Sequence, residues 1–269
     1  MRTGVCETGS AHIHYLRTGG GGPPLVLLHG LTANGACWTP LARSLENEFD
    51  VVMPDARGHG KSSAPLHGYR YEDHASDVIG LIGELGLTAP VLLGHSMGGM
   101  TAAVVASQMG NAIHGAILAD PTFLSPERQR EVRDSDVADQ HRRLLSLSKD
   151  EVLAEARARH PHRSSEILEL LAEARLQTRL SAFDVLTPPN PACHQVVSTI
   201  RAPVLLVIGD APVVSPETAG ELQRLNPSVR VQQIPGAGHG LPYDQPDRFA
   251  AVVRSFLKSL PGSDQLFAK

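Results

Sequence analysis

The length and composition of this chain fit a folded protein with a sizeable hydrophobic core. Its 269 residues are 42% hydrophobic and 19% charged, which allows one large α/β domain or two small ones. The formal net charge of -4 comes from 24 basic and 28 acidic residues, so we expect no nucleic-acid partner and no anionic membrane surface as partner.

Other exclusions follow from local sequence. No stretch has the long uncharged apolar run of a membrane helix, and residues 1–10 lack the apolar core of a signal peptide. The cysteines Cys6, Cys37 and Cys193 are scattered and have no metal-binding spacing. We therefore expect a cytoplasmic protein with reduced thiols and no metal site.

Six short apolar runs predict buried strands, and they lie at residues 24–29, 51–54, 91–94, 113–120, 204–209 and 229–234. Most runs are continuous rather than alternating, as expected for strands covered on both faces. Helical stretches separate most of them, which predicts an α/β fold with a doubly wound, mostly parallel sheet. Ligands bind at the carboxyl ends of the strands in such sheets, so the polar residues that follow these runs are the first site candidates.

The first run leads into "LVLLHGLTANGACW", residues 25–38. Gly30 lets the backbone turn so that the amide of Leu31 can face a site, where it would form an oxyanion hole together with the amide of Met97. We count Gly30 among the substrate-binding residues. His29 is expected to be a structural hydrogen-bonding residue, and Trp38 either belongs to the core or lines the substrate pocket.

The third run ends in "GHSMGG", residues 94–99. This sequence fits the pattern G-x-S-x-G, which places a serine on a sharp turn between a strand and a helix. Glycines two residues before and two after Ser96 leave room for that turn, and an Ala/Val-rich helix follows. We therefore predict that Ser96 is a nucleophile, which requires a neighbouring base and a third group that orients the base. The adjacent His95 is expected to have a packing role.

Residues 123–186 interrupt the alternation, because they contain no convincing strand and have helical spacing. We predict a helical cap over 123–186, inserted into a core domain formed by 1–122 and 187–269. Helix starts are expected at Ser125, Ser148, Ser215 and Asp244, which are capping residue types. The cap carries many arginines, most of them expected on a solvated face; His141 and Arg142 are predicted to contact substrate, because an inward-facing cation could hold a substrate carboxylate.

The base is predicted to be His239, in the glycine-flanked loop "GAGHG" between the last strand and the last helix. The acid has two candidates. Asp210 directly follows the strand "VLLVIG" and is expected to lie too close to it, and Pro212 lies two residues further on; Asp120 ends the run "GAILAD". We prefer Asp120, because a triad is defined by geometry and roles rather than by sequence position.

Together these residues resemble the α/β-hydrolase superfamily. The resemblance extends from His14 to Leu260 and rests on "HG" at 29–30, "DARGHGKS" at 55–62, "GHSMGG", "LADP" at 118–121 and "GAGHGLPYDQP" at 236–246. Within the superfamily the chain is similar to the N-formylmaleamate deformylase and 2-(acetamidomethylene)succinate hydrolase type. The resemblance implies eight mostly parallel strands, a helical cap, a Ser–acid–His triad and no cofactor, with the acid on the strand that carries Asp120.

The leading interpretation is a serine hydrolase that cleaves a small ester, lactone or amide through an acyl-enzyme on Ser96, such as an N-acyl enamine or N-formyl amide of a ring-degradation product. A serine at position 96 argues against the dehalogenase and epoxide-hydrolase variants, which need a carboxylate nucleophile. A carbon–carbon bond hydrolase or a cofactor-free perhydrolase would use the same triad, and a small-molecule receptor is the non-enzymatic alternative. The expected partner is a small-molecule substrate, and a homodimer is one of the oligomeric states that the sequence allows.

Overall fold

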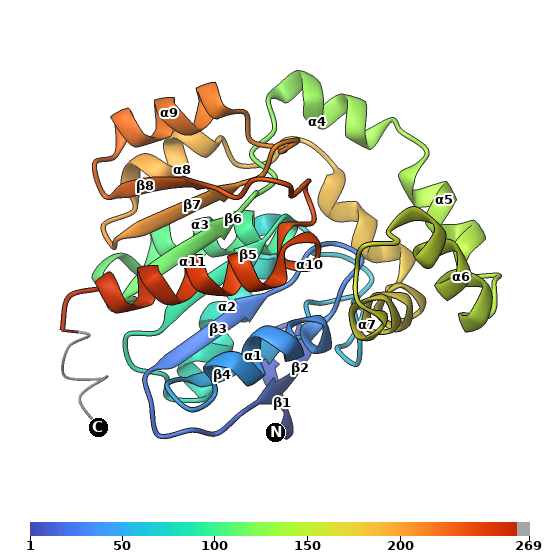
Figure 1. Ribbon diagram of the computed structural model, residues 1–269, viewed down its shortest axis with the longest axis horizontal. Coiled ribbons are helices and arrows are strands. Elements are labelled where there is room, and N and C mark those ends of the chain that lie inside the picture. Colours follow the sequence, from blue (N-terminus) through green and yellow to red (C-terminus); the bar gives the residue numbers. More distant parts are fainter. Residues whose placement is uncertain (263–269) are drawn as a thin grey trace.

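The computed structural model describes residues 1–262 and contains one eight-stranded sheet (Figure 1). The strand order is β1-β2-β4-β3-β5-β6-β7-β8. Strands β1 and β2 pair antiparallel with each other, β2 pairs antiparallel with β4, and all later pairs are parallel. The bounds are β1 Arg2–Thr8, β2 Ala11–Arg17, β3 Pro24–Leu28, β4 Asp50–Pro54, β5 Val91–His95, β6 Gly115–Ala119, β7 Val204–Ile208 and β8 Val229–Gln233.

The predicted fold class is confirmed, and the six predicted apolar runs correspond to β3 through β8. The helices around the sheet are η1 Gly35–Trp38, α1 Thr39–Leu45, α2 Tyr71–Glu84, α3 Met97–Met109, η2 Gly110–Ala112, α4 Pro126–Arg133, α5 Val137–Leu144, α6 Lys149–Arg159, α7 Ser165–Leu176, η3 Leu180–Leu186, α8 Cys193–Thr199, α9 Pro216–Leu225, α10 Leu241–Asp244 and α11 Pro246–Ser259. Within residues 1–262, none of these helices combines the length and the apolar character that a membrane crossing needs.

The hydrophobic core lies on both faces of the sheet. Neighbouring residues of one strand point to opposite faces, so Val26 packs in one core cluster and Leu25 and Leu27 in the other. Helices α2, α3, α8 and α9 contribute to the first cluster, while α1 and α11 contribute to the second. This double coverage explains why the central strands are continuous apolar runs.

Helices α4 to α7 lie together beyond one end of the sheet, to the upper right and right in Figure 1. Helices α6 and α7 pack against each other around a separate small core of Val152, Leu153, Ala156, Leu168 and Ala172. We propose that residues 123–186 form the cap of this protein. Helix α8 returns to the main core, because Val197 joins the cluster under α3.

Three of the four predicted helix starts are confirmed. The hydroxyls of Ser125, Ser148 and Ser215 each accept a backbone N–H at the start of α4, α6 and α9. The prediction for Asp244 is wrong, because α11 begins at Pro246 with Gln245 as its N-cap. The carboxylate of Asp244 is instead occupied by Arg163.

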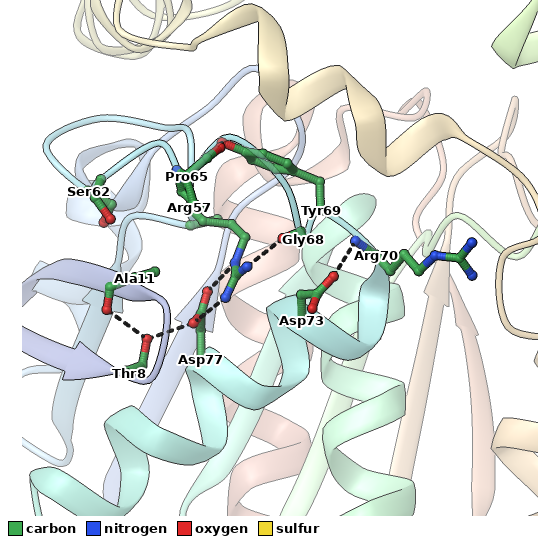
Figure 2. A network of polar contacts seen from close by, with 12 residues as sticks. Thr8, Ala11, Arg57, Ser62, Pro65, Gly68, Tyr69, Arg70, Asp73 and Asp77 are labelled. Carbon is green, nitrogen blue, oxygen red and sulfur yellow. Dashed lines mark hydrogen bonds and ion pairs between the residues drawn. The ribbon is translucent and has the colours of Figure 1, made fainter.

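A buried ion pair fixes the loop that follows β4 (Figure 2). Nε and Nη2 of Arg57 donate to the two carboxylate oxygens of Asp77 in α2, at 2.6 and 2.7 Å, and Thr8 Oγ1 donates to the same carboxylate. The guanidinium also donates to the carbonyl of Gly68. Arg57 is 2% exposed, so removing either partner would leave a buried charge and cost about 3–5 kcal/mol. The loop at 55–63 therefore has a structural role.

The buried histidines predict how stability depends on pH. Burial lowers the pKa of His74 and of His95 to about 3, and it lowers the pKa of His29 and His59 as well. These rings are neutral in the folded state, whereas their pKa in the unfolded chain is about 6.5. As the pH falls below 6.5, each of these rings becomes protonated in the unfolded chain but stays neutral in the folded protein. The free energy of unfolding therefore decreases by about 1.4 kcal/mol per pH unit for each such ring.

Urea unfolding between pH 7.5 and 5.0 measures this slope. The His74→Gln variant removes one of the four contributions and should flatten the slope accordingly. A free energy of unfolding that stays constant over this range would contradict the neutral assignment.

Candidate active site

Ser96 lies on a strained turn between β5 and α3. Its φ of 55° is in the left-handed region, which costs a non-glycine residue about 1–3 kcal/mol and occurs mainly at functional sites. A Cβ on Gly94 would come within 2.0 Å of the carbonyl oxygen of Gly98, and a Cβ on Gly98 within 2.3 Å of that of Leu28. Only glycine fits at both places, so the turn described by the sequence pattern is present.

Ser96, His239 and Asp120 form a chain of hydrogen bonds. Nε2 of His239 lies 2.9 Å from Oγ of Ser96, and Nδ1 lies 2.6 Å from Oδ2 of Asp120. A carboxylate accepts the Nδ1 proton, which leaves Nε2 free to accept the serine hydroxyl. The sheet explains the proximity: His95 pairs with Ala119 across β5 and β6, so Ser96 and Asp120 follow directly on neighbouring strands.

Asp120 is fully buried and its carboxylate is held by backbone amides. Both oxygens accept from the amide of Val213, at 3.0 and 2.9 Å, and Oδ1 also accepts from the amide of Val214 at 3.0 Å. Asp120 is 0% exposed and its φ is 41°. These amides stabilise the ionised carboxylate and orient it toward His239. Sequence reasoning missed Val213 and Val214, whose only signal is their place beside Pro212 in the loop after β7.

Asp210 has a different environment. It is exposed and accepts from the amide of Gly236 at 2.6 Å and from Nε2 of Gln233 at 2.9 Å. Its own amide donates to the carbonyl of Ala237 at 2.7 Å. The structure thus brings Asp120, and not Asp210, to the ring of His239.

The predicted oxyanion residues lie beside Ser96. A Cβ on Gly30 would be 3.3 Å from Cβ of Ser96, so the loop after β3 runs close to the serine. Met97 begins α3, and the first amides of a helix have no acceptor within that helix. His29 anchors the loop: its Nδ1 donates to the carbonyl of Gly30 at 2.8 Å and its Nε2 accepts the amide of Ala56 at 2.9 Å.

His95 holds the loop that carries His239. Its Nε2 donates to the carbonyl of His239 at 2.7 Å, and the two ring centroids are 5.0 Å apart. Burial and the neighbouring His239 lower the pKa of His95 to about 3. Its ring is therefore neutral at neutral pH and does not act as a second base beside His239. The packing role expected from the sequence thus includes a hydrogen bond that the sequence did not indicate.

A cap residue supports the same loop. Nε of Arg163 donates to Oδ1 of Asp244 at 2.8 Å, and Oδ2 of Asp244 accepts the amide of Gly238 at 3.2 Å. The side chains of Arg163 and Asp244 are only 10% and 9% exposed. A Cβ on Gly240 would come within 2.5 Å of the guanidinium. The residues on both sides of His239 are therefore fixed by contacts that reach into the cap segment.

Ser96 and His239 open into a cleft of about 520 Å³ between the core and the cap segment. Gly30 and Leu31 line it on the core side, and Arg163 and Arg175 on the cap side. No group of three or more His, Cys, Asp or Glu side chains within residues 1–262 is arranged to hold a metal ion. The cleft can therefore present a nucleophile, backbone amides and cations to a small molecule.

Trp38, Arg142 and His141 do not line the cleft of Ser96, and of the two roles considered for Trp38 the structure supports the core. Trp38 is 1% exposed, stacks on Phe249 and lines a separate cavity, because it belongs to the core beneath α1 and α11. Arg142 is exposed and pairs with Asp139 one helical turn earlier. His141 is buried, lies in an adjoining cavity, and its Nε2 donates to the carbonyl of Thr178 at 3.0 Å.

A model of the alpha/beta hydrolase family matches residues 25–252. N-formylmaleamate deformylase of Pseudomonas putida is 32% identical over 259 residues, covering 91% of this chain and 92% of the relative. The 2-(acetamidomethylene)succinate hydrolase of Mesorhizobium japonicum is 28% identical over 256 residues, covering 90% of each.

Among solved structures, an E-2-(acetamidomethylene)succinate hydrolase superimposes with a TM-score of 0.84 at 24% identity, covering 96% of this chain and 99% of that one. At that identity the superposition supports the fold alone. The family match and the deformylase relative span nearly the whole chain. The chain therefore belongs to the alpha/beta hydrolase family, and it is an enzyme.

Proposed function

We propose that this hydrolase cleaves its small substrates by acyl transfer to Ser96. The observation that carries the proposal is the hydrogen-bonded series Ser96 Oγ, His239 Nε2, His239 Nδ1 and Asp120 Oδ2, at 2.9 and 2.6 Å. A serine hydroxyl is a weak nucleophile at neutral pH and needs a base that a third group orients. Both requirements are met by side chains from three different segments.

In the first step Oγ of Ser96 attacks the substrate carbonyl carbon while Nε2 of His239 takes the hydroxyl proton. The carbonyl oxygen becomes an oxyanion, which the amides of Leu31 and Met97 stabilise. The bond to the leaving group then breaks, and His239 gives its proton to the departing oxygen or nitrogen. An acyl-enzyme ester on Ser96 remains.

In the second step water attacks the ester carbonyl and His239 takes one of its protons. The tetrahedral intermediate collapses, the proton returns to Oγ of Ser96, and the free acid leaves. Asp120 stays ionised throughout and stabilises the imidazolium that forms twice per turnover. Water is the one co-reactant of these two steps, and no group is oxidised or reduced.

The proposed substrate is a small ester, lactone or amide. The names of two relatives, a deformylase of N-formylmaleamate and a hydrolase of 2-(acetamidomethylene)succinate, support an N-acyl compound, with a formyl group on an amide nitrogen in the first and an acetyl group on an enamine nitrogen in the second. We therefore propose both that the substrate is such an N-acyl compound and that its acyl group is transferred to Ser96.

A substrate panel tests this function. It comprises short p-nitrophenyl esters, lactones and N-acyl enamines, assayed with the wild-type enzyme and with Ser96→Ala. The proposal expects turnover of at least one class, loss of that turnover in Ser96→Ala, and covalent labelling of Ser96 by a fluorophosphonate. Folded wild-type protein that neither turns over any member nor reacts with the fluorophosphonate would instead indicate a receptor.

A further inference from the structure

The cleft beside Ser96 is rich in positive charge. Its lining includes Arg163, Arg175, His160 and His162, whereas Asp244 is the one acidic residue among the described residues that line it. That carboxylate is already occupied, since it accepts from Arg163 at 2.8 Å and from the amide of Gly238 at 3.2 Å. The cleft thus has more cationic than anionic groups around the nucleophile.

Arg175 is the cation that the protein itself leaves uncompensated in this cleft. Within residues 1–262 no carboxylate lies within ion-pair distance of its guanidinium, and no acceptor forms a hydrogen bond with it. Six of the ten arginines within residues 123–186 pair with acids: Arg128, Arg130, Arg142, Arg157, Arg159 and Arg163. Of the four without an ion pair, the other three are exposed and do not line this cleft. Because the side chain of Arg175 is half-buried, water compensates its charge less well than it does at an exposed surface.

The surroundings of Arg175 add to the unfavourable environment of its positive charge. Burial, together with the positive charges of Arg159 and Arg163, lowers the pKa of its guanidinium, and the negative charge of Glu155 offsets only part of this; an arginine stays charged at neutral pH. An anion bound among these cations would relieve both the desolvation and the mutual repulsion. The environment therefore favours a bound negative charge.

Arg175 is also well positioned relative to the proposed reaction centre. It lies in the last turn of α7, and the preceding Ala174 packs with Ala33 and Tyr243. Both segments are close to the site, since Ala33 follows the Gly30–Leu31 turn and Tyr243 contacts the ring of His95. Arg175 lines both the cleft of Ser96 and an adjoining cavity, whose other charged residues are Arg143, Arg159, Asp136 and Glu155. Glu155 is already paired with Arg159. A substrate group that extends away from Ser96 toward the cap would meet Arg175.

We propose that Arg175 binds a carboxylate of the substrate, so that the enzyme acts on acyl compounds that carry a free acid group besides the carbonyl that Ser96 attacks. A guanidinium donates two parallel hydrogen bonds to a carboxylate, which gives orientation as well as affinity. This inference rests on the proposed function for its kinetics, while the binding site itself can be tested without turnover. It assigns to Arg175 the role that the sequence suggested for Arg142 and His141.

The binding test uses Ser96→Ala protein, which cannot turn over ligand under the proposed mechanism. Succinate should raise its Tm in a concentration-dependent manner, and the neutral analogue succinamide should not. Adding Arg175→Gln should abolish the shift, whereas Arg142→Gln should leave it unchanged because Arg142 is exposed and paired with Asp139. The absence of a succinate shift in Ser96→Ala, or an equal shift after Arg175→Gln, overturns the inference.

The kinetic test compares the mono-p-nitrophenyl ester of succinic acid with its methyl-capped, neutral counterpart. Arg175→Gln should lower kcat/KM for the acidic ester by a factor on the order of 10 to 100, while kcat/KM for the neutral ester changes little and shows that the variant is folded. Arg175→Lys should recover part of the loss. An equal effect on both esters overturns the carboxylate role. Undiminished hydrolysis by Ser96→Ala contradicts the proposed function instead. In that case the succinate-binding test alone decides whether Arg175 forms a carboxylate site.

Discussion

Replacing Ser96 with alanine is expected to lower kcat by a factor on the order of 10⁶, because the acyl-enzyme route is lost. The hydroxyl oxygen that lies 2.9 Å from Nε2 of His239 is the atom that forms the covalent bond. Background hydrolysis would remain from the backbone amides and from substrate binding alone. Steady-state rates with the best ester of the panel measure the effect, with circular dichroism to confirm that the variant is folded.

Two further variants sharpen this prediction. The double change Ser96→Ala with His239→Ala should cost little beyond the single change, because the residues of a triad act as a unit. Ser96→Gly should be as inactive as Ser96→Ala. Its free energy of unfolding should be higher than that of Ser96→Ala by about 1 kcal/mol, because glycine adopts the positive φ of 55° without strain. Additive losses in the double variant would contradict a shared mechanism.

Replacing Asp120 with asparagine is expected to lower kcat by a factor on the order of 10³ to 10⁴ and to leave the fold intact. The carboxylate lies 2.6 Å from Nδ1 of His239 and is held by the amides of Val213 and Val214. An amide group in its place cannot stabilise the imidazolium and can favour the wrong tautomer of the ring. The expected signature is a loss in kcat.

Asp210→Asn is the matched control for this change. Asp210 is exposed and only joins Gly236 and Gln233, so its replacement should reduce kcat by far less and act mainly on the local loop. A larger loss in Asp210→Asn than in Asp120→Asn would show that the acid has been assigned to the wrong residue.

The sequence predicted the central strands because burial on both faces leaves a simple pattern. Strands β3 through β7 are almost wholly buried, and apart from Asp50 and His95 they consist of apolar residues and glycine. Strands β1 and β2 were not located from the residues, since they are partly exposed and mix apolar with polar side chains, as in "AHIHYLR". A strand that mixes exposed polar and buried apolar residues without a continuous apolar run gives a weaker signal than a buried one.

The candidate triad was predictable because strand ends and glycine-rich turns are visible in the sequence. Adjacent strands β5 and β6 bring Ser96 and Asp120 together, and the loop after β8 brings His239 to them. The amides that hold Asp120 were not predictable, because a backbone contact across 93 positions leaves no residue-type signal.

The cap contacts were harder to predict because its helices are amphipathic and rich in arginine. Periodicity does not show which arginine meets an acid from another helix and which one remains unpaired. The short-range pair of Arg142 with Asp139 was readable from its i, i+3 spacing, whereas the lack of a partner at Arg175 depends on the packing of α7 against the core. The role of Trp38 was left open for a similar reason, since a buried tryptophan and a pocket-lining one look alike in sequence.

The most direct test of the acyl-transfer account is rapid-quench mass spectrometry of the wild-type enzyme with p-nitrophenyl acetate. The account predicts a transient acetyl adduct of one per chain, located on the peptide that contains Ser96, formed in the same phase as an initial release of p-nitrophenol. The adduct should be absent from Ser96→Ala and should form much more slowly in Asp120→Asn. Sustained turnover by the wild-type enzyme with no adduct, or with an adduct on another residue that is needed for turnover, would contradict the account.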